Sequence, residues 1–66
     1  MNAKQFLDEF GKVEAERIAI KAGTNWAYFS QIAYGHRRPS AKLAKAMVEA
    51  SGGRMDFEAL LLAEAA

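Results

Sequence analysis

The chain has 66 residues, no cysteine, a net charge of +1 and 52% hydrophobic residues. This length allows a single domain over 1–66, and the lack of cysteine excludes disulfides and thiolate metal sites. The hydrophobic content excludes an intrinsically disordered chain. No targeting segment is visible and no apolar run approaches the roughly 18 residues of a membrane span. We therefore expect a cytoplasmic protein without a membrane partner.

Glycines divide the sequence into helix-sized segments, because helices commonly end at a residue with positive φ. The first helix is predicted over 3–10, with Asn2 as its N-cap. Its apolar face comprises Ala3, Phe6, Leu7 and Phe10. The second is predicted over 14–22, with Ile20 pointing away from the core. Its apolar stripe comprises Ala15, Ile18, Ala19 and Ala22.

The third helix is predicted over 25–34, with Asn25 as N-cap and Gly35 beyond its end. The fourth is predicted over 41–50 after the N-cap Ser40. Its inward residues are Leu43, Met47 and Ala50. The fifth is predicted over 56–63 after the cap Asp56, with Met55 and Leu60 forming a hydrophobic staple. Its buried side comprises Phe57, Leu60 and Leu61. No segment alternates with period two, so we expect an all-α fold of five short helices.

Charge is segregated along the chain. No acidic residue lies between Glu16 and Glu49, and that stretch has a local charge of +6. Its cations are Arg17, Lys21, Arg37, Arg38, Lys42 and Lys45. A basic middle in a nearly neutral chain is typical of a surface that binds a polyanion, although chance clustering on a solvated surface is the alternative.

The join between the second and third predicted helices is the most informative segment. Gly23 allows a sharp turn with positive φ, and Asn25 then starts a new helix. The small side chain of Ala19 allows the two helices to cross closely. Three residues supply the apolar wedge between them: Ile18, Phe29 and Ile32. This pattern predicts a helix-turn-helix over about 14–34.

The outward face of the third predicted helix is small, polar and uncharged, as entry into the DNA major groove requires. Tyr28, Phe29 and Ile32 fall on its inward side. On the outward side, Gln31 could pair with adenine, Ser30 could bond several bases, and Ala27 could touch a thymine methyl. The alternative for Gln31 is an ordinary solvated side chain.

Positively charged residues follow the third predicted helix in the sequence. Arg37 and Arg38 are expected to contact phosphates, with a solvated loop as the alternative. Lys42 and the backbone N–H groups that follow Ser40 would form a second phosphate site. His36 is the single histidine, so a metal site is not expected, and we place it in the loop near DNA.

Residues 18–40 read I-A-I-K-A-G-T-N-W-A-Y-F-S-Q-I-A-Y-G-H-R-R-P-S. This segment resembles the helix-turn-helix of Cro-type and lambda-repressor-like phage transcriptional regulators. The resemblance implies a repressor that acts at a double-stranded DNA operator, on the nucleoid of a bacterial host. It implies base-reading residues at Trp26, Ala27, Ser30 and Gln31. It implies phosphate contacts at Asn25, Tyr34, Arg37 and Arg38.

Two residues depart from the family pattern. Thr24 stands where valine or isoleucine is usual, and Trp26 stands where a small or polar residue is usual. Trp26 could stack on a sugar or meet a thymine methyl, or it could lean back on the preceding helix as a partly buried residue. Tyr34 could bond phosphate through its hydroxyl or cap the helix end.

Leu60, Leu61 and Leu62 are consecutive, and one helix face cannot bury all three. We therefore expect a homodimer, weak or induced by DNA, that binds two half-sites about one DNA turn apart. A monomer with an apolar tail is the alternative.

The leading functional hypothesis is thus a sequence-specific DNA-binding repressor. The runner-up is a protein-interaction module, such as a small antitoxin or adaptor, that uses the same helices to bind a partner protein. An enzyme is not expected, because the sequence has no phosphate-binding glycine loop, no metal cluster and no credible base near its serines. We expect no cofactor and no small-molecule substrate.

Overall fold

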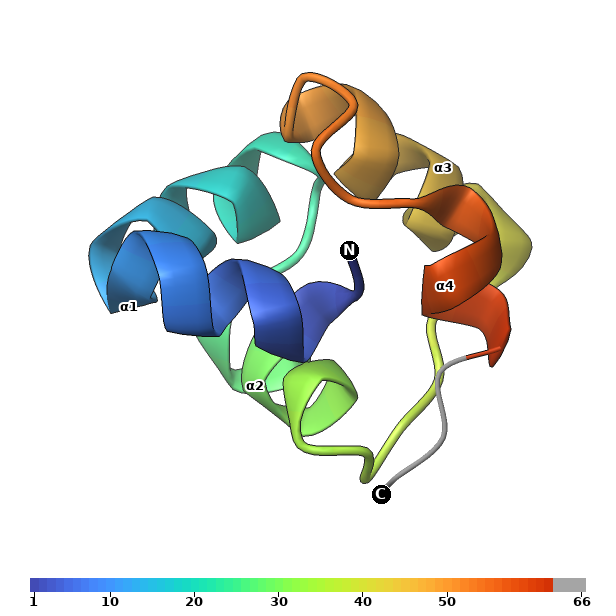
Figure 1. Ribbon diagram of the computed structural model, residues 1–66, viewed down its shortest axis with the longest axis horizontal. Coiled ribbons are helices and arrows are strands. Elements are labelled where there is room, and N and C mark those ends of the chain that lie inside the picture. Colours follow the sequence, from blue (N-terminus) through green and yellow to red (C-terminus); the bar gives the residue numbers. More distant parts are fainter. Residues whose placement is uncertain (63–66) are drawn as a thin grey trace.

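The computed structural model describes residues 1–62, without the side chain of Leu62. It contains four helices, α1 (Ala3–Lys21), α2 (Trp26–Ala33), α3 (Ala41–Ala50) and α4 (Phe57–Leu62), and no strand within the described residues (Figure 1). The predicted all-α class is therefore confirmed. The predicted end of the last helix at residue 63 lies outside the described residues.

The predicted count of five helices is not confirmed, because 3–21 form one helical element with a sharp bend at Gly11. Gly11 has φ 87° and ψ 170°, a combination that is essentially restricted to glycine. The bend divides α1 into two arms that correspond to the two helices expected there (Figure 1). The sequence predicts a helix end at this glycine, whereas the chain resumes its helical path directly after it.

Local side-chain bonds explain where the helices begin. The Asn2 side-chain oxygen accepts a hydrogen bond from the Gln5 backbone N–H, and the Asn2 backbone N–H in turn donates to the Gln5 side-chain oxygen. Asn25 caps α2 by accepting from the Tyr28 N–H at 2.9 Å, and Ser40 caps α3. Three of the four predicted N-caps, Asn2, Asn25 and Ser40, are thus confirmed, because each side-chain oxygen satisfies a backbone donor that the helix leaves unpaired. At the fourth, Asp56, a side-chain oxygen accepts from the Glu58 N–H at 3.3 Å.

The ends of α1 and α2 share one hydrogen-bond pattern. After α1, the Thr24 N–H donates to the Ala19 carbonyl at 2.9 Å and the Gly23 N–H donates to the Ile20 carbonyl at 3.0 Å. This pair of bonds is a Schellman motif, which requires a positive φ at the glycine, here 90°. The chain therefore reverses sharply after α1 and starts α2 within a few residues.

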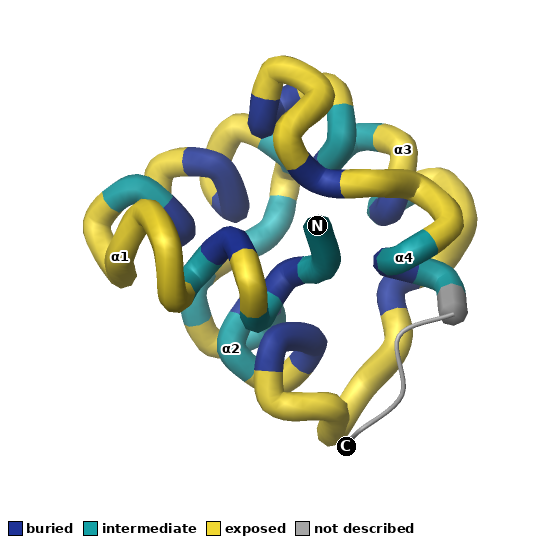
Figure 2. Tube along the Cα trace, in the orientation of Figure 1, coloured by how far each residue is buried: buried dark blue, intermediate teal, exposed yellow. Residues whose placement is uncertain are grey.

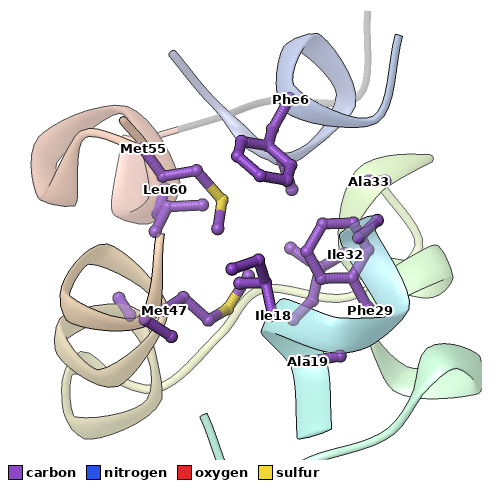
Figure 3. Close-up of a cluster of buried hydrophobic side chains, with 13 residues drawn as sticks. Phe6, Ile18, Ala19, Phe29, Ile32, Ala33, Met47, Met55 and Leu60 are labelled. Atoms are coloured by element: carbon purple, nitrogen blue, oxygen red, sulfur yellow. The ribbon is translucent and has the colours of Figure 1, made fainter. Parts of the chain in front are cut away.

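The core lies where α1 packs against α2 and α3, and where α4 packs against α3 (Figure 2). Its largest fully buried side chains are Phe6, Ile18, Phe29, Met47, Met55 and Leu60 (Figure 3). Met55 and Leu60 are both 1% exposed, which fits the expected staple. The Met1 carbonyl accepts from the Asp56 N–H at 2.9 Å, so the N-terminus joins the loop before α4.

Two predictions of burial were wrong. Phe10 is 38% exposed, because α1 bends at the next residue, Gly11. The Arg54 guanidinium carbon lies over its ring, 5.0 Å from the centroid. Phe57 is 40% exposed, because Leu60 rather than Phe57 fills the core beneath α4. Leu43 and Leu61 are half-buried against the core, and Ile20 is exposed as expected. None of the described helices is both long and apolar enough to cross a membrane.

Candidate nucleic-acid interface

The second arm of α1, the turn at 22–25 and α2 form one packed unit. Ala19 is fully buried, so the two helices approach closely at this point. The three residues predicted as the wedge are all buried: Ile18, Phe29 and Ile32 (Figure 3). The inward side of α2 is thus fixed to the core, and the residues on its other side face solvent.

The solvent-facing side of α2 carries no charged residue. Ala27 and Gln31 are exposed, and Tyr34, which is the C-cap residue of α2, is 53% exposed. Ser30 is half-buried, and its hydroxyl donates to the Ala27 carbonyl at 2.9 Å. The Ser30 oxygen therefore remains available as an acceptor, while its single donor is used within the helix.

Trp26 lies at the start of α2 and is half-buried against the core. Its ring stacks on Phe29 with centroids 6.1 Å apart, and Lys12 Nζ lies 5.2 Å from its centroid. The sequence left two positions open for Trp26. The structure has the one in which the side chain leans back and is partly buried. The contact between Lys12 and Trp26 cannot be predicted from the sequence, because it depends on the bend at Gly11.

The loop after α2 turns back over the last turn of the helix. The His36 backbone N–H donates to the Gln31 carbonyl at 2.8 Å, while the His36 side chain is exposed. Arg37 Nε donates to Gln31 Oε1 at 2.8 Å, and the Arg37 guanidinium carbon lies 4.9 Å from the Tyr28 ring centroid. One expected phosphate contact, Arg37, is therefore joined to one expected base reader, Gln31.

Other expected contacts lie apart from this pair. Arg38 is exposed and forms no ion pair within residues 1–62. The Asn25 side-chain oxygen caps α2, which leaves its amide NH₂ free to donate. The Tyr34 ring lies beneath Lys4, whose Nζ is 5.6 Å from the ring centroid. The approach of Lys4 was not expected from the sequence.

The basic stretch is not uniformly available. Arg17 is paired with Glu14 through two hydrogen bonds of 2.8 and 2.7 Å, and Arg54 lies 3.9 Å from the same carboxylate. The hydrogen bond from Arg17 lowers the pKa of Glu14 below its usual value. Five cations of the stretch form no ion pair within the described part of the chain: Lys21, Arg37, Arg38, Lys42 and Lys45. Their charge is thus free to act on a ligand.

The start of α3 lies beside the turn that precedes α2. One hollow of about 190 Å³ is lined by Ala22, Ser40, Lys42, Leu43 and Ala46. Lys42, in the first turn of α3, therefore lies near the end of α1 as well as near the N-terminal N–H groups of its own helix. Such a position suits an anion that runs past both elements.

Within residues 1–62, no group of three or more histidine, aspartate or glutamate side chains is placed to hold a metal ion. No protein-family model, curated protein or solved structure matches this chain.

Proposed function

We propose that the protein is a sequence-specific, double-stranded DNA-binding transcriptional regulator, a Cro-like repressor that inserts α2 of a helix-turn-helix into the major groove. One observation supports this most strongly. The exposed side of α2 is uncharged, and the cations that follow it in the chain form no ion pair within residues 1–62. An ordinary solvated helix face carries lysine and glutamate, whereas a groove-reading helix needs polar groups that do not repel DNA.

In this proposal, Ala27 and Gln31 contact base edges, because both are exposed. Ser30 contributes as an acceptor, since its hydroxyl proton is already donated to Ala27. Trp26, which is half-buried at the start of α2, contributes a contact there while its ring stays stacked on Phe29. The major groove is about 12 Å wide, enough to admit an α-helix with short side chains.

Phosphate contacts in this proposal flank α2 on both sides. Near the start of α2, phosphates are contacted by the Asn25 amide NH₂ and by Lys42. Beyond its end, they are contacted by His36 and Arg38. The Tyr34 hydroxyl adds a neutral contact. These groups would supply most of the affinity and little of the sequence preference.

A homodimer on two half-sites completes the proposal, because one copy of such a small domain reads few base pairs. Leu60 lies in the core and Leu61 is half-buried against it, so neither is free for a partner. The Leu62 side chain is outside the described residues. Among the described side chains of α4, Phe57, at 40% exposure, is the large apolar residue available to a second copy.

The test is a selection of binding sites from random DNA, followed by titrations of the selected duplex over a series of salt concentrations. Affinity should fall steeply with salt, with a logarithmic slope of about 0.9 for each phosphate contacted. Arg38→Ala should reduce this slope by about 1 and weaken all sequences alike. Gln31→Ala should cost about 1–3 kcal/mol on the selected site alone.

A matched control is Glu14→Gln with Arg17→Gln, which removes an ion pair without changing the net charge. Because that pair is already neutral as a unit, the salt slope should not move. Absence of binding to any DNA at low salt would refute the proposal.

A second function is favoured by a different surface. Val13 is 83% exposed and Ile20 is 65% exposed, and they lie seven residues apart on the second arm of α1. That spacing places them on one helix face, which would suit an antitoxin-like or adaptor module that binds a protein. Val13→Gln with Ile20→Gln should leave DNA binding intact, and it should abolish binding to a partner protein if that function is the true one.

A further inference from the structure

The loop after α2 is folded so that Arg37 returns to the helix it follows. The Gly35 N–H donates to the Ile32 carbonyl at 3.2 Å, and the His36 N–H donates to the Gln31 carbonyl at 2.8 Å. These two bonds form a Schellman motif at the end of α2. The motif fixes the backbone direction at residue 36, so Arg37 lies beside the last turns of α2 instead of extending into solvent.

Two contacts then restrain the Arg37 side chain. Its Nε donates to Gln31 Oε1 at 2.8 Å, and its guanidinium carbon lies 4.9 Å from the centroid of the Tyr28 ring. Tyr28 is itself half-buried and packed against the core, so its ring is a fixed platform. A planar guanidinium can stack on a ring with its face while its N–H groups donate in its own plane, which an ammonium cannot do.

The chemistry of arginine fixes the orientation of the glutamine. A guanidinium has only donors, so the amide atom that faces Arg37 Nε must be the oxygen. The Gln31 NH₂ group then points away from Arg37. The Arg37 Nη groups form no hydrogen bond within residues 1–62. The pair therefore presents mainly donors to a ligand, the Gln31 NH₂ and the Arg37 Nη groups, beside the second lone pair of Gln31 Oε1.

We infer that Gln31 and Arg37 act as one reading unit that prefers guanine, with Arg37 as the residue that positions Gln31. Guanine presents two acceptors in the major groove, N7 and O6. Cytosine presents a donor, and adenine places a donor beside its single acceptor. This inference rests on the proposed function, and it replaces adenine, the base expected for an unrestrained glutamine, with guanine.

The experiment begins with sites selected by the wild-type protein from random DNA. At the position most affected by Gln31→Ala, the relative affinity for each of the four base pairs is then measured for a set of variants. Gln31→Glu keeps the partner of Arg37 but removes the NH₂ group, so the preference for guanine should fall about tenfold. Arg37→Lys keeps the charge but not the planar contacts, so affinity should largely persist while this preference falls about fivefold.

Arg38→Ala is the matched control, since Arg38 is the adjacent exposed arginine and forms no hydrogen bond with Gln31. It should weaken binding to every sequence and leave the base preference unchanged. The double variant Gln31→Ala with Arg37→Ala should lose no more discrimination than either single variant, because the two residues act as a unit. Gln31 and Arg37 are exposed, and circular dichroism checks that each variant keeps its helices.

A measurement without DNA tests the pairing itself. In NMR spectra of the free protein, the Arg37 Nε–H should exchange with water more slowly than the Arg38 Nε–H, and Gln31→Ala should abolish the difference. Equal exchange in the wild type would overturn the positioning role.

Failure of the wild type to bind any DNA would refute the proposed function and the base preference with it. Binding with no guanine preference at this position, or with a preference that Arg37→Lys leaves intact, would overturn the inference alone.

Discussion

The turn between α1 and α2 offers a perturbation whose cost can be worked from geometry. Gly23 has φ +90°, and a Cβ added there would meet nothing within 4 Å. Gly23→Ala therefore introduces no clash, and its cost is that of a positive φ alone, about 1–2 kcal/mol. The alanine also lowers the conformational entropy of the unfolded chain, which offsets about 0.4–1 kcal/mol of this cost. The net loss of unfolding free energy should be about 1 kcal/mol.

Gly11 provides the comparison. A Cβ there would also meet nothing within 4 Å, but ψ is 170°, which leaves the backbone in a region essentially closed to other residues. Gly11→Ala should therefore cost about 2 kcal/mol. Asparagine tolerates the left-handed helical region, so Gly23→Asn should recover part of the loss. Gly11→Asn should recover none, because its conformation lies outside that region.

Urea denaturation of the four variants measures these differences. For a 66-residue chain the total unfolding free energy is about 3–10 kcal/mol, so each variant should stay folded in water. A loss of 1 kcal/mol corresponds to a melting temperature lower by about 4–8 °C. Equal stability of Gly11→Ala and the wild type would show that α1 does not bend at this glycine. Identical losses for alanine and asparagine at Gly23 would refute the Schellman geometry at the turn.

Three further predictions concern the core, a cap and an ion pair. Phe29→Ala, at a fully buried ring beneath α2, should cost about 3–5 kcal/mol in urea denaturation and remove most of the helical circular dichroism at 37 °C. Ser40→Ala should cost about 1 kcal/mol in the same assay, because the Leu43 N–H loses its acceptor. The hydrogen bond from Arg17 lowers the pKa of Glu14, so its stabilisation exists above the ordinary value of 4.5 and is lost as the pH falls through the lower folded-state pKa. Melting temperatures measured from pH 6 to pH 2 should therefore fall less for Glu14→Gln than for the wild type.

The helix starts could be predicted because they depend on neighbouring residues. Asn2, Asn25 and Ser40 each bond a backbone N–H three residues ahead, and this arrangement is visible in the sequence. The bend at Gly11 could not be predicted in the same way. A glycine after a helical run has the same sequence signal whether the helix ends or resumes, and packing decides between the two.

The candidate site shows the same division between local and distant effects. Helical periodicity alone predicted that Ala27 and Gln31 face solvent and that Phe29 is buried. The hydrogen bond from Arg37 to Gln31 spans six residues and depends on the turn after α2, so helical periodicity cannot predict it. Lys12 reaches Trp26 only because α1 bends.

The surroundings of Trp26 make it a natural optical reporter. It is the single tryptophan of the chain, it stacks on Phe29, and a lysine ammonium lies 5.2 Å from its ring at the start of α2. Indole emission shifts with polarity and with nearby charge, so unfolding and any ligand that displaces Lys12 should change the fluorescence differently. Unlabelled protein at low concentration would thus report on its own folding and on the occupancy of the α2 surface from one emission spectrum.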